Sequence, residues 1–441
     1  KGAFFCGIRS DMSLITTLLE QQADYFLFFS GFMFILLGGY CFLLRRFPGT
    51  RVQWLYLGLF GVSYGIFHFI HFAGEYLGSL FWIQVSARIF LFVSAFFLLE
   101  FGRAHFSPRI KRFFAIGIFP GLLLYGLLLG FIVPHQLDLF GMQLLSSGGI
   151  CAAIAMTFQL RVIQERRFLI ASAILYCIGY SCAHFFLVPG SVFLIPFEFL
   201  SATILVFILR FYTTQIGYRF HVRETGRVFI RQDYWQAGII IFLLVAGMLA
   251  TYVSGRQQSL RLKQTLIEQT KLLAAAFDNH SYAEIVASSN PSQTQGYLRL
   301  RKQMRYLQTI IPQTIRWFYV MSLADGKPFF VVDSIDEGQF GHVEPFTLDY
   351  KEPPQELFSV FNTAEAACVG PYSDEWGTFL SGFAPIFSPD KRTVIGVLAI
   401  DIEAHTWRRS VFAAHFWPMF VTGLLIIIVL TVFSYRRRQL V

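Results

Sequence analysis

Nine apolar runs, each about as long as a membrane helix, constrain this chain more than any other feature. About 20 consecutive apolar residues cross a bilayer as a helix. The runs are Tyr25–Leu44, Trp54–Ala73, Leu80–Phe101, Phe113–Ile132, Leu139–Leu160, Phe168–Val188, Val192–Tyr212, Trp235–Ser254 and Phe412–Tyr435. Only 14% of the 441 residues are charged, against about 25% in soluble domains. The sequence therefore predicts a multi-pass α-helical membrane protein with nine spans, and it excludes a disordered chain and an ordinary cytosolic enzyme.

The basic residues predict how the spans are oriented. Half of the 36 lysines and arginines follow the first, third, fifth, seventh and ninth runs, and none follows the second, fourth or sixth directly. Basic residues collect in cytoplasmic segments. We therefore expect the N-terminus outside and the C-terminus in the cytoplasm. This pattern accounts for most of the net charge of +9, so we expect no nucleic-acid partner.

The segments between the runs predict the domain organisation. The expected parts are an extracytoplasmic segment 1–24, a seven-helix bundle 25–212, a basic cytoplasmic linker 213–233, an eighth span 234–254, an extracytoplasmic domain 255–411, a ninth span 412–435 and a cytoplasmic connector 436–441. The domain 255–411 contains 15 basic and 17 acidic residues, as a soluble domain would. Because the chain begins with Lys1 and stops just after an apolar run, we expect it to be part of a larger protein.

The outer domain has the pattern of an α+β fold. Its apolar periodicity predicts a helix over 256–280, which continues the eighth span, and a second helix over 292–310. Strand-like segments follow at 315–322, 329–334, 378–388 and 393–403. Asp325-Gly326 predicts a hairpin turn, because such turns need positive φ angles. The last strand leads directly into the ninth span.

Two groups of motifs resemble a known class of receptor. The segments 329–334, 370–377 and 396–402 resemble a single Cache domain, a PAS-like extracytoplasmic sensor. The segments 59–68 and 98–103 resemble the seven-helix input region of some bacterial sensor histidine kinases and diguanylate cyclases. The resemblance implies a bacterial inner-membrane receptor with a PAS/Cache-like domain. It also implies a homodimer with contacts along 256–277 and the last two spans.

Six ionisable side chains are expected near the outer ends of the spans: His68, His71, Glu75, Arg88, His184 and Glu198. Ionisable residues inside membrane helices are costly and are therefore functional candidates. Three interpretations remain open. In the first, the charges only neutralise one another; in the second, the cluster binds the polar head of a ligand; in the third, His68, His71 and His184 hold a metal ion or haem.

A second candidate site lies in the outer domain. Its residues are Arg316, Trp317, Tyr319, Asp333, Tyr372, Asp374, Trp376 and Ser381. The resemblance implies a ligand between the sheet and a covering loop, with Tyr319 and Asp333 on neighbouring strands and Tyr372, Asp374 and Trp376 on the loop. Aromatic side chains with carboxylates suit a small polar or cationic ligand. The alternative is that the aromatic residues fill the core and Asp374 caps a turn.

The resulting functional hypothesis is the input half of a signalling receptor. We expect a small-molecule or lipid ligand, contact with membrane lipids, and a cytoplasmic output that is a histidine kinase or, alternatively, a diguanylate cyclase. A transporter or channel with an accessory domain, and a membrane enzyme that uses the histidines on a lipid, are alternatives of other classes. The sequence contains no phosphate-binding loop, nucleophile elbow or zinc-protease motif, so no catalytic residue is assigned.

Overall fold

The computed structural model describes residues 22–46, 53–77, 81–104, 198–207, 209–210, 226–288, 291–310, 315–335, 353–374 and 376–439, together with residues 19, 196, 346 and 350. These residues belong to two compact units. The first, here called the membrane unit, comprises 1–252 and 415–441, and the second, the outer domain, comprises 253–414.

Five helices in the described residues are long and apolar enough to cross a membrane. They are α2 (Ala23–Leu44), α3 (Trp54–Leu77), α4 (Phe81–Ala104), α10 (Gly226–Ala275) and α14 (Ala404–Gln439). They coincide with five of the predicted runs, so the prediction of membrane helices is confirmed for these. The runs predicted at 113–132, 139–160 and 168–188 lie outside the described residues. The run at 192–212 is described in part, as the apolar helix Glu198–Phe207.

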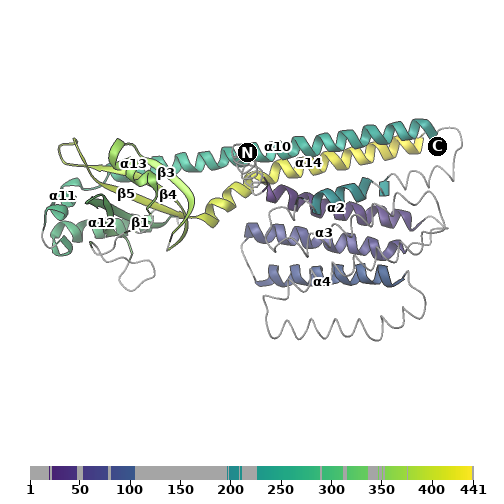
Figure 1. Ribbon diagram of the computed structural model, residues 1–441, viewed down its shortest axis with the longest axis horizontal. Helices are drawn as coiled ribbons and strands as arrows, with labels where there is room; N and C mark the ends of the chain where they lie inside the picture. The colour runs from purple at the N-terminus through teal and green to yellow at the C-terminus, as the bar shows by residue number, and fades with distance from the viewer. Residues whose placement is uncertain are drawn as a thin grey trace, which may run out of the picture. The chain divides into compact units, whose positions relative to one another are not determined.

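Helices α2 and α3 pack closely along a seam of small residues (Figure 1). A side chain added at Gly61 would lie 2.7 Å from the Phe34 carbonyl oxygen, and one at Gly65 would lie 2.7 Å from the Gly31 carbonyl oxygen. Small residues let helix backbones approach in a membrane, where the hydrophobic effect does not drive helices together. This seam explains why glycine recurs within two otherwise strongly apolar helices.

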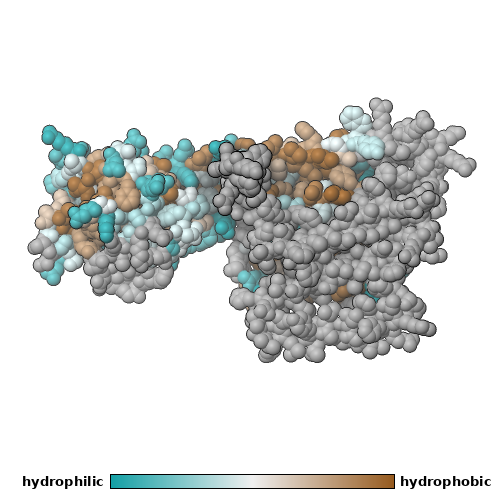
Figure 2. Space-filling model, in the orientation of Figure 1, coloured by the Kyte–Doolittle hydropathy of each residue, from teal (hydrophilic) through white to brown (hydrophobic). Residues whose placement is uncertain are grey.

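Two polar contacts join α2 to the last two membrane helices. Tyr25 donates a hydrogen bond to the Leu244 carbonyl of α10 at 2.5 Å. His415 Nδ1 of α14 lies 3.0 Å from Asp24 Oδ2. In contrast, Phe242 of α10 and Trp417 of α14 are 70% and 67% exposed. Figure 2 shows hydrophobic side chains gathered on this surface, as expected for helices that face lipid.

The outer domain begins with the second part of α10, which continues the apolar segment as predicted. The helix ends at Ala275, five residues earlier than expected, and a separate helix α11 (Asn279–Ala287) follows. Asp278 caps α11 by accepting from the backbone N–H groups of His280 and Ser281, which satisfies donors that the first turn leaves free. The predicted second helix is confirmed as η4 (Pro291–Gln293) and α12 (Gln295–Ile310).

A five-stranded antiparallel sheet follows in the order β2-β1-β5-β4-β3. The strands are β1 (Ile315–Ala324), β2 (Lys327–Asp333), β3 (Ala367–Asp374), β4 (Gly377–Phe387) and β5 (Val394–Glu403). The predicted hairpin turn is confirmed, with positive φ angles at Asp325 and Gly326. Helix α14 begins at Ala404, immediately after β5, so the last strand does lead straight into the last membrane segment.

The two faces of the sheet are covered differently. One face packs against α10, α11 and α12 through residues such as Leu266, Ile285 and Leu300. The other face carries a smaller aromatic core that includes Trp317, Phe330 and Phe379, closed in part by helix α13 (Gln355–Thr363). Since strand side chains alternate between faces, the α+β domain has a helical face and an aromatic face.

The segment expected to be a covering loop is instead strand β3, and this corrects the prediction for Tyr372 and Asp374. Strand β3 lies at the edge of the sheet, and its pairing with β4 is irregular between Val369 and Tyr372, where Pro371 stands. Proline is tolerated at edge strands and bulges. Trp376, however, does lie in the turn between β3 and β4.

Candidate functional site

A cavity opens on the aromatic face of the outer domain. The lining residues are Trp317, Phe318, Tyr319, Phe330, Asp333, Ile335, Tyr350, Asp374, Trp376 and Asp401. The space open to the centre of a water-sized sphere is about 30 Å³, and one water molecule needs about 10–15 Å³ by that measure. In this conformation the cavity therefore has room for a ligand of a few non-hydrogen atoms.

The cavity combines aromatic rings with acidic groups. The Phe330 ring centroid lies 5.2 Å from that of Tyr319, 5.8 Å from Tyr350 and 5.7 Å from Trp376. Three of the lining residues are aspartates, and none of those described is basic. Aromatic faces and carboxylates both attract cations, so the local electrostatics favour a positively charged guest.

Asp401, on β5, is the most deeply placed acid of the cavity. Its side chain is buried, and Oδ1 accepts hydrogen bonds from Ser381 at 2.5 Å and from Tyr319 at 3.3 Å. Burial raises the pKa of this carboxyl to about 7, although the bonds from Ser381 and Tyr319 oppose the shift. Asp401 therefore changes its charge near neutral pH.

A chain of polar contacts connects Asp401 to Asp374 across the cavity. From Ser381 the chain passes to the Tyr372 hydroxyl at 3.0 Å and then to the Tyr350 hydroxyl at 3.4 Å, and the single Tyr372 proton can be donated to either neighbour. Tyr350 donates to Asp374 Oδ2 at 3.0 Å. Burial, as the main cause, raises the pKa of Tyr372 and Tyr350. Both hydroxyls therefore remain neutral donors at physiological pH.

Asp374 also organises the turn that carries Trp376. Its Oδ1 accepts from the backbone N–H groups of Trp376 at 2.9 Å and Gly377 at 3.2 Å. The Trp376 ring then packs against Tyr350, with centroids 5.6 Å apart. Asp374 thus caps a turn, as one interpretation expected, and lines the cavity, as the other expected.

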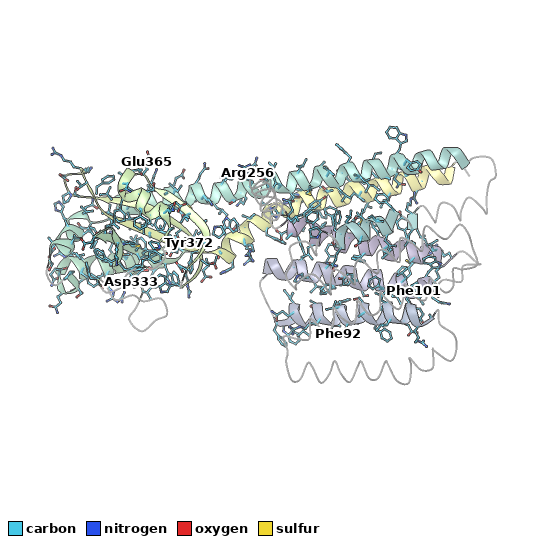
Figure 3. The ribbon with its side chains drawn as sticks, in the orientation of Figure 1. Phe92, Phe101, Arg256, Asp333, Glu365 and Tyr372 are labelled. Atoms are coloured by element: carbon cyan, nitrogen blue, oxygen red, sulfur yellow. The ribbon has the colours of Figure 1, made fainter. Side chains whose placement is uncertain are left out.

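The structure brings most of the predicted outer-domain residues together, and Figure 3 labels two of these residues, Asp333 and Tyr372. Those that line the cavity are Trp317, Tyr319, Asp333, Asp374 and Trp376. Tyr372 and Ser381 join it through the hydrogen-bonded chain. Tyr319 and Asp333 pair across β1 and β2, as expected. Arg316 does not line the cavity; its side chain is 52% exposed and its Nε lies 3.2 Å from Glu403 Oε1.

Sequence reasoning missed five of the residues that line the cavity: Phe318, Phe330, Ile335, Tyr350 and Asp401. The signal for Asp401 was present, because an acidic residue stands at the end of an otherwise apolar strand segment, 397–402, and charged residues are rarely buried without partners. Phe330 resembled any other core residue of its strand. Tyr350 lies in a segment with no regular pattern, and only the three-dimensional structure places it.

Of the six intramembrane candidates, the structure brings two into contact. His68 Nε2 lies 3.6 Å from Glu198 Oε2, and Tyr64 donates to Glu198 Oε1 at 3.0 Å. His68 and Glu198 are both buried, and the His68 ring is stacked parallel to Phe34 at a centroid distance of 5.7 Å. This arrangement is a polar contact between α3 and the helix Glu198–Phe207.

Of the other four intramembrane candidates, the structure describes the side chains of His71 and Arg88. The His71 ring stacks on Phe67 at 6.1 Å, and Arg88 lies half-buried on α4. The side chain of Glu75 and all of His184 are outside the described residues. Among the residues that are described, no group of three metal-ligating side chains is found. A metal ion or haem at His68, His71 and His184 thus stays a hypothesis.

We expect the Tyr64→Phe substitution to destabilise the membrane unit by about 0.5–1.5 kcal/mol, since it removes the hydroxyl that Glu198 accepts from. The measurement is the thermal unfolding midpoint of the full chain in detergent. Tyr234→Phe is the control, because Tyr234 is 70% exposed on α10. Equal midpoints for both variants would show that the Tyr64 bond contributes nothing.

The function of the cavity is inferred from three features: its aromatic walls, its three aspartates and its position on the sheet next to α14. Comparison of the chain with family models, with curated proteins and with solved structures finds no match.

Proposed function

We propose that this chain is the input half of a signalling receptor of the bacterial inner membrane. The outer domain, on the extracytoplasmic side, detects a small cationic molecule and passes the signal to a cytoplasmic output. By its resemblance to such receptors, that output is a sensor histidine kinase, with a diguanylate cyclase as the alternative. The receptor works as a homodimer. The exposed leucines Leu260 and Leu272 on the outer part of α10 support such a contact.

One observation carries this proposal: the acidic, aromatic cavity is built on the strand that continues into a membrane helix. Asp401 lines the cavity, β5 ends two residues later at Glu403, and α14 begins at Ala404. A ligand that moves Asp401 therefore acts on a group only a few residues from the start of α14. This continuity favours a receptor over a carrier, whose binding site would lie along a path through the membrane.

The chemistry of the cavity favours an amine. An ammonium group gains from the faces of Trp376 and Phe330, with about 0.5–2 kcal/mol for each cation–π contact. It also compensates the charge of Asp333, Asp374 and Asp401. An anion would meet three carboxylates and no basic group among the described lining residues. The free volume limits the guest to a small molecule in this conformation.

A shift of the sheet can reach both segments that flank the domain. The indole Nε1 of Trp407, near the start of α14, lies 3.3 Å from Ser259 Oγ of α10. A ligand that favours one of two arrangements of this contact would shift their populations, and small helix displacements are a common form of switching. We therefore expect the contact between Ser259 and Trp407 to couple ligand binding to α10 and α14.

The proposal is tested by titrating the full chain, in nanodiscs, with a series of small primary amines and with the matching alcohols. We expect binding of at least one amine and of no alcohol. Asp374→Asn should lower the affinity for the amine by about tenfold or more, because a hydrogen bond to a charged group contributes about 1.5–3 kcal/mol. Asp390→Asn is the matched control, since Asp390 also accepts a backbone N–H in a turn but lies outside the cavity.

The passage of the signal from the cavity to α10 and α14 is tested by a separate measurement. Saturation with the bound amine should change the hydrogen-exchange protection of α10 near Ser259 and of α14 near Trp407. Binding of alcohols as tight as that of amines would contradict a cation site. Tight amine binding without any change in protection at these two segments would contradict the receptor while leaving the cation site intact.

A further inference from the structure

A second pocket lies within the membrane unit. It is at those helix ends that have basic residues next to them in the sequence. It is formed by α2, the helix that contains Val206 and Arg210, and the membrane parts of α10 and α14. Its size resembles that of the outer cavity, with about 30 Å³ open to the centre of a water-sized sphere. Unlike the outer cavity, it contains a cation.

The polar end of this pocket is formed by three side chains. Arg210 Nη2 donates to Gln236 Oε1 at 3.0 Å, and the guanidinium carbon lies 5.9 Å from the centroid of the Tyr40 ring. Gln236 is only 2% exposed, and no described residue accepts a hydrogen bond from its Nε2. Leaving a buried donor without an acceptor costs about 1–3 kcal/mol, so this position calls for an acceptor.

The remainder of the pocket is apolar. Side chains such as Met33, Val206, Ile240 and Leu430 form its walls, and no acidic residue is among the described lining residues. The pocket thus offers a cation and an amide donor at one end and hydrocarbon along the rest. A pocket of this kind is complementary to an amphiphile with an anionic head group.

We propose that this pocket binds a phosphate group, held by Arg210 and Gln236 Nε2, and that the phosphate belongs to the head of an anionic phospholipid whose acyl chain follows the apolar walls. Arginine binds phosphate oxygens through charge-assisted hydrogen bonds. Gln236 contributes the second donor that distinguishes a built site from a single surface charge.

The surroundings increase the local concentration of such a lipid. Arg45 and Arg46, at the end of α2, are exposed, and Arg436 to Arg438 follow in sequence about two helical turns after Leu430. Juxtamembrane arginines attract anionic lipids. Because α10 and α14 both line the pocket, an occupied site would bear on the same two helices that flank the outer domain.

The test is native mass spectrometry of the full chain released from nanodiscs that contain either phosphatidylglycerol or phosphatidylcholine. We expect the wild type to retain phosphatidylglycerol and to prefer it over phosphatidylcholine by about tenfold, because both lipids carry a phosphate but the choline ammonium of phosphatidylcholine is repelled by the Arg210 guanidinium. Arg210→Gln and Gln236→Leu should each lower the retained fraction by a similar factor. Arg261→Gln removes the same charge from an exposed position in the outer domain, away from the pocket, and should retain wild-type binding. Thermal midpoints show whether each variant is folded.

Two outcomes would overturn the proposal: no retained phosphatidylglycerol in the wild type, or equal retention by folded Arg210→Gln and Gln236→Leu variants. Competition by millimolar inorganic phosphate identifies the source of the phosphate. Displacement of the lipid by free phosphate would support a phosphate site filled from solution, and resistance to it would support a lipid whose chain contributes to binding. Neither result depends on whether the outer domain binds amines.

Discussion

The free energy of unfolding of the outer domain should fall by up to about 4 kcal/mol as the pH rises from about 4 to above 7, and Asp401→Asn should abolish this fall. Burial raises the pKa of Asp401 from 3.8 to about 7. A carboxyl with a raised folded-state pKa stabilises the fold fully below its unfolded pKa, and it loses that contribution as the pH rises through the folded pKa. The amide oxygen that Asp401→Asn introduces would still accept from Ser381 and Tyr319, so the variant changes charge with little change in shape.

The measurement is urea unfolding of the full chain between about pH 4 and pH 8, a range that spans the unfolded and the folded pKa of Asp401. Tryptophan fluorescence follows the outer domain, because Trp317 and Trp376 both line its cavity. Asp390→Asn, an exposed turn residue whose pKa is lowered by its bond from Ser388, should keep the wild-type slope. A wild-type stability that does not fall over this range would show that Asp401 is not held protonated by the fold.

The same titration bears on ligand binding. A bound ammonium group favours the ionised form of Asp401, and protons therefore compete with the ligand below about pH 7. We infer that a receptor of this kind would respond to pH as well as to its ligand. The affinity for an amine should rise with pH in the wild type and become flat in the Asp401→Asn variant.

The sequence predicted the elements whose signal is local. Membrane helices follow from runs of apolar residues, the hairpin from Asp325-Gly326, and four of the five strands from strand-like segments. Strand β3 was missed because Gly370 and Pro371 interrupt it, and proline normally argues against a strand. It forms because β4 pairs with it on both sides of this interruption, and that support is tertiary.

The candidate site was predictable to the extent that its chemistry is unusual in sequence. Aromatic residues near carboxylates in strand-like segments were identified, and five of the eight line the cavity. Tyr350 could not be predicted, because its role depends on hydroxyl contacts with Tyr372 and Asp374 across the domain. The Arg210–Gln236 contact joins residues from two helices 26 positions apart and has no motif.

The strand β4 links the cavity to α10 through two adjacent residues. Ser381 donates to Asp401 on the aromatic face, and Gly382 lies on the opposite face against α10. A Cβ at Gly382 would stand 2.5 Å from Thr270 Oγ1 and 2.8 Å from Leu266 Cγ. The sheet therefore separates the ligand from the helix by the thickness of one strand.

Substituting Gly382 with Val should accordingly destabilise the outer domain by about 3 kcal/mol or more, because overpacking a tight contact typically costs about 1–3 kcal/mol and Val adds about three carbons there. The sign of the change in the free energy of unfolding is informative, because Gly→Val in a strand otherwise tends to stabilise the protein. Urea unfolding followed by tryptophan fluorescence measures the loss.

Gly238→Ala, on α10 with open space around its Cβ, should be neutral or stabilising by up to about 1 kcal/mol. Thr270→Ala should restore part of the stability lost in Gly382→Val, because the two side chains would compete for one space. A Gly382→Val variant as stable as the wild type would show that β4 and α10 do not pack at this distance, and the coupling between cavity and helix would then have to run through β5 alone.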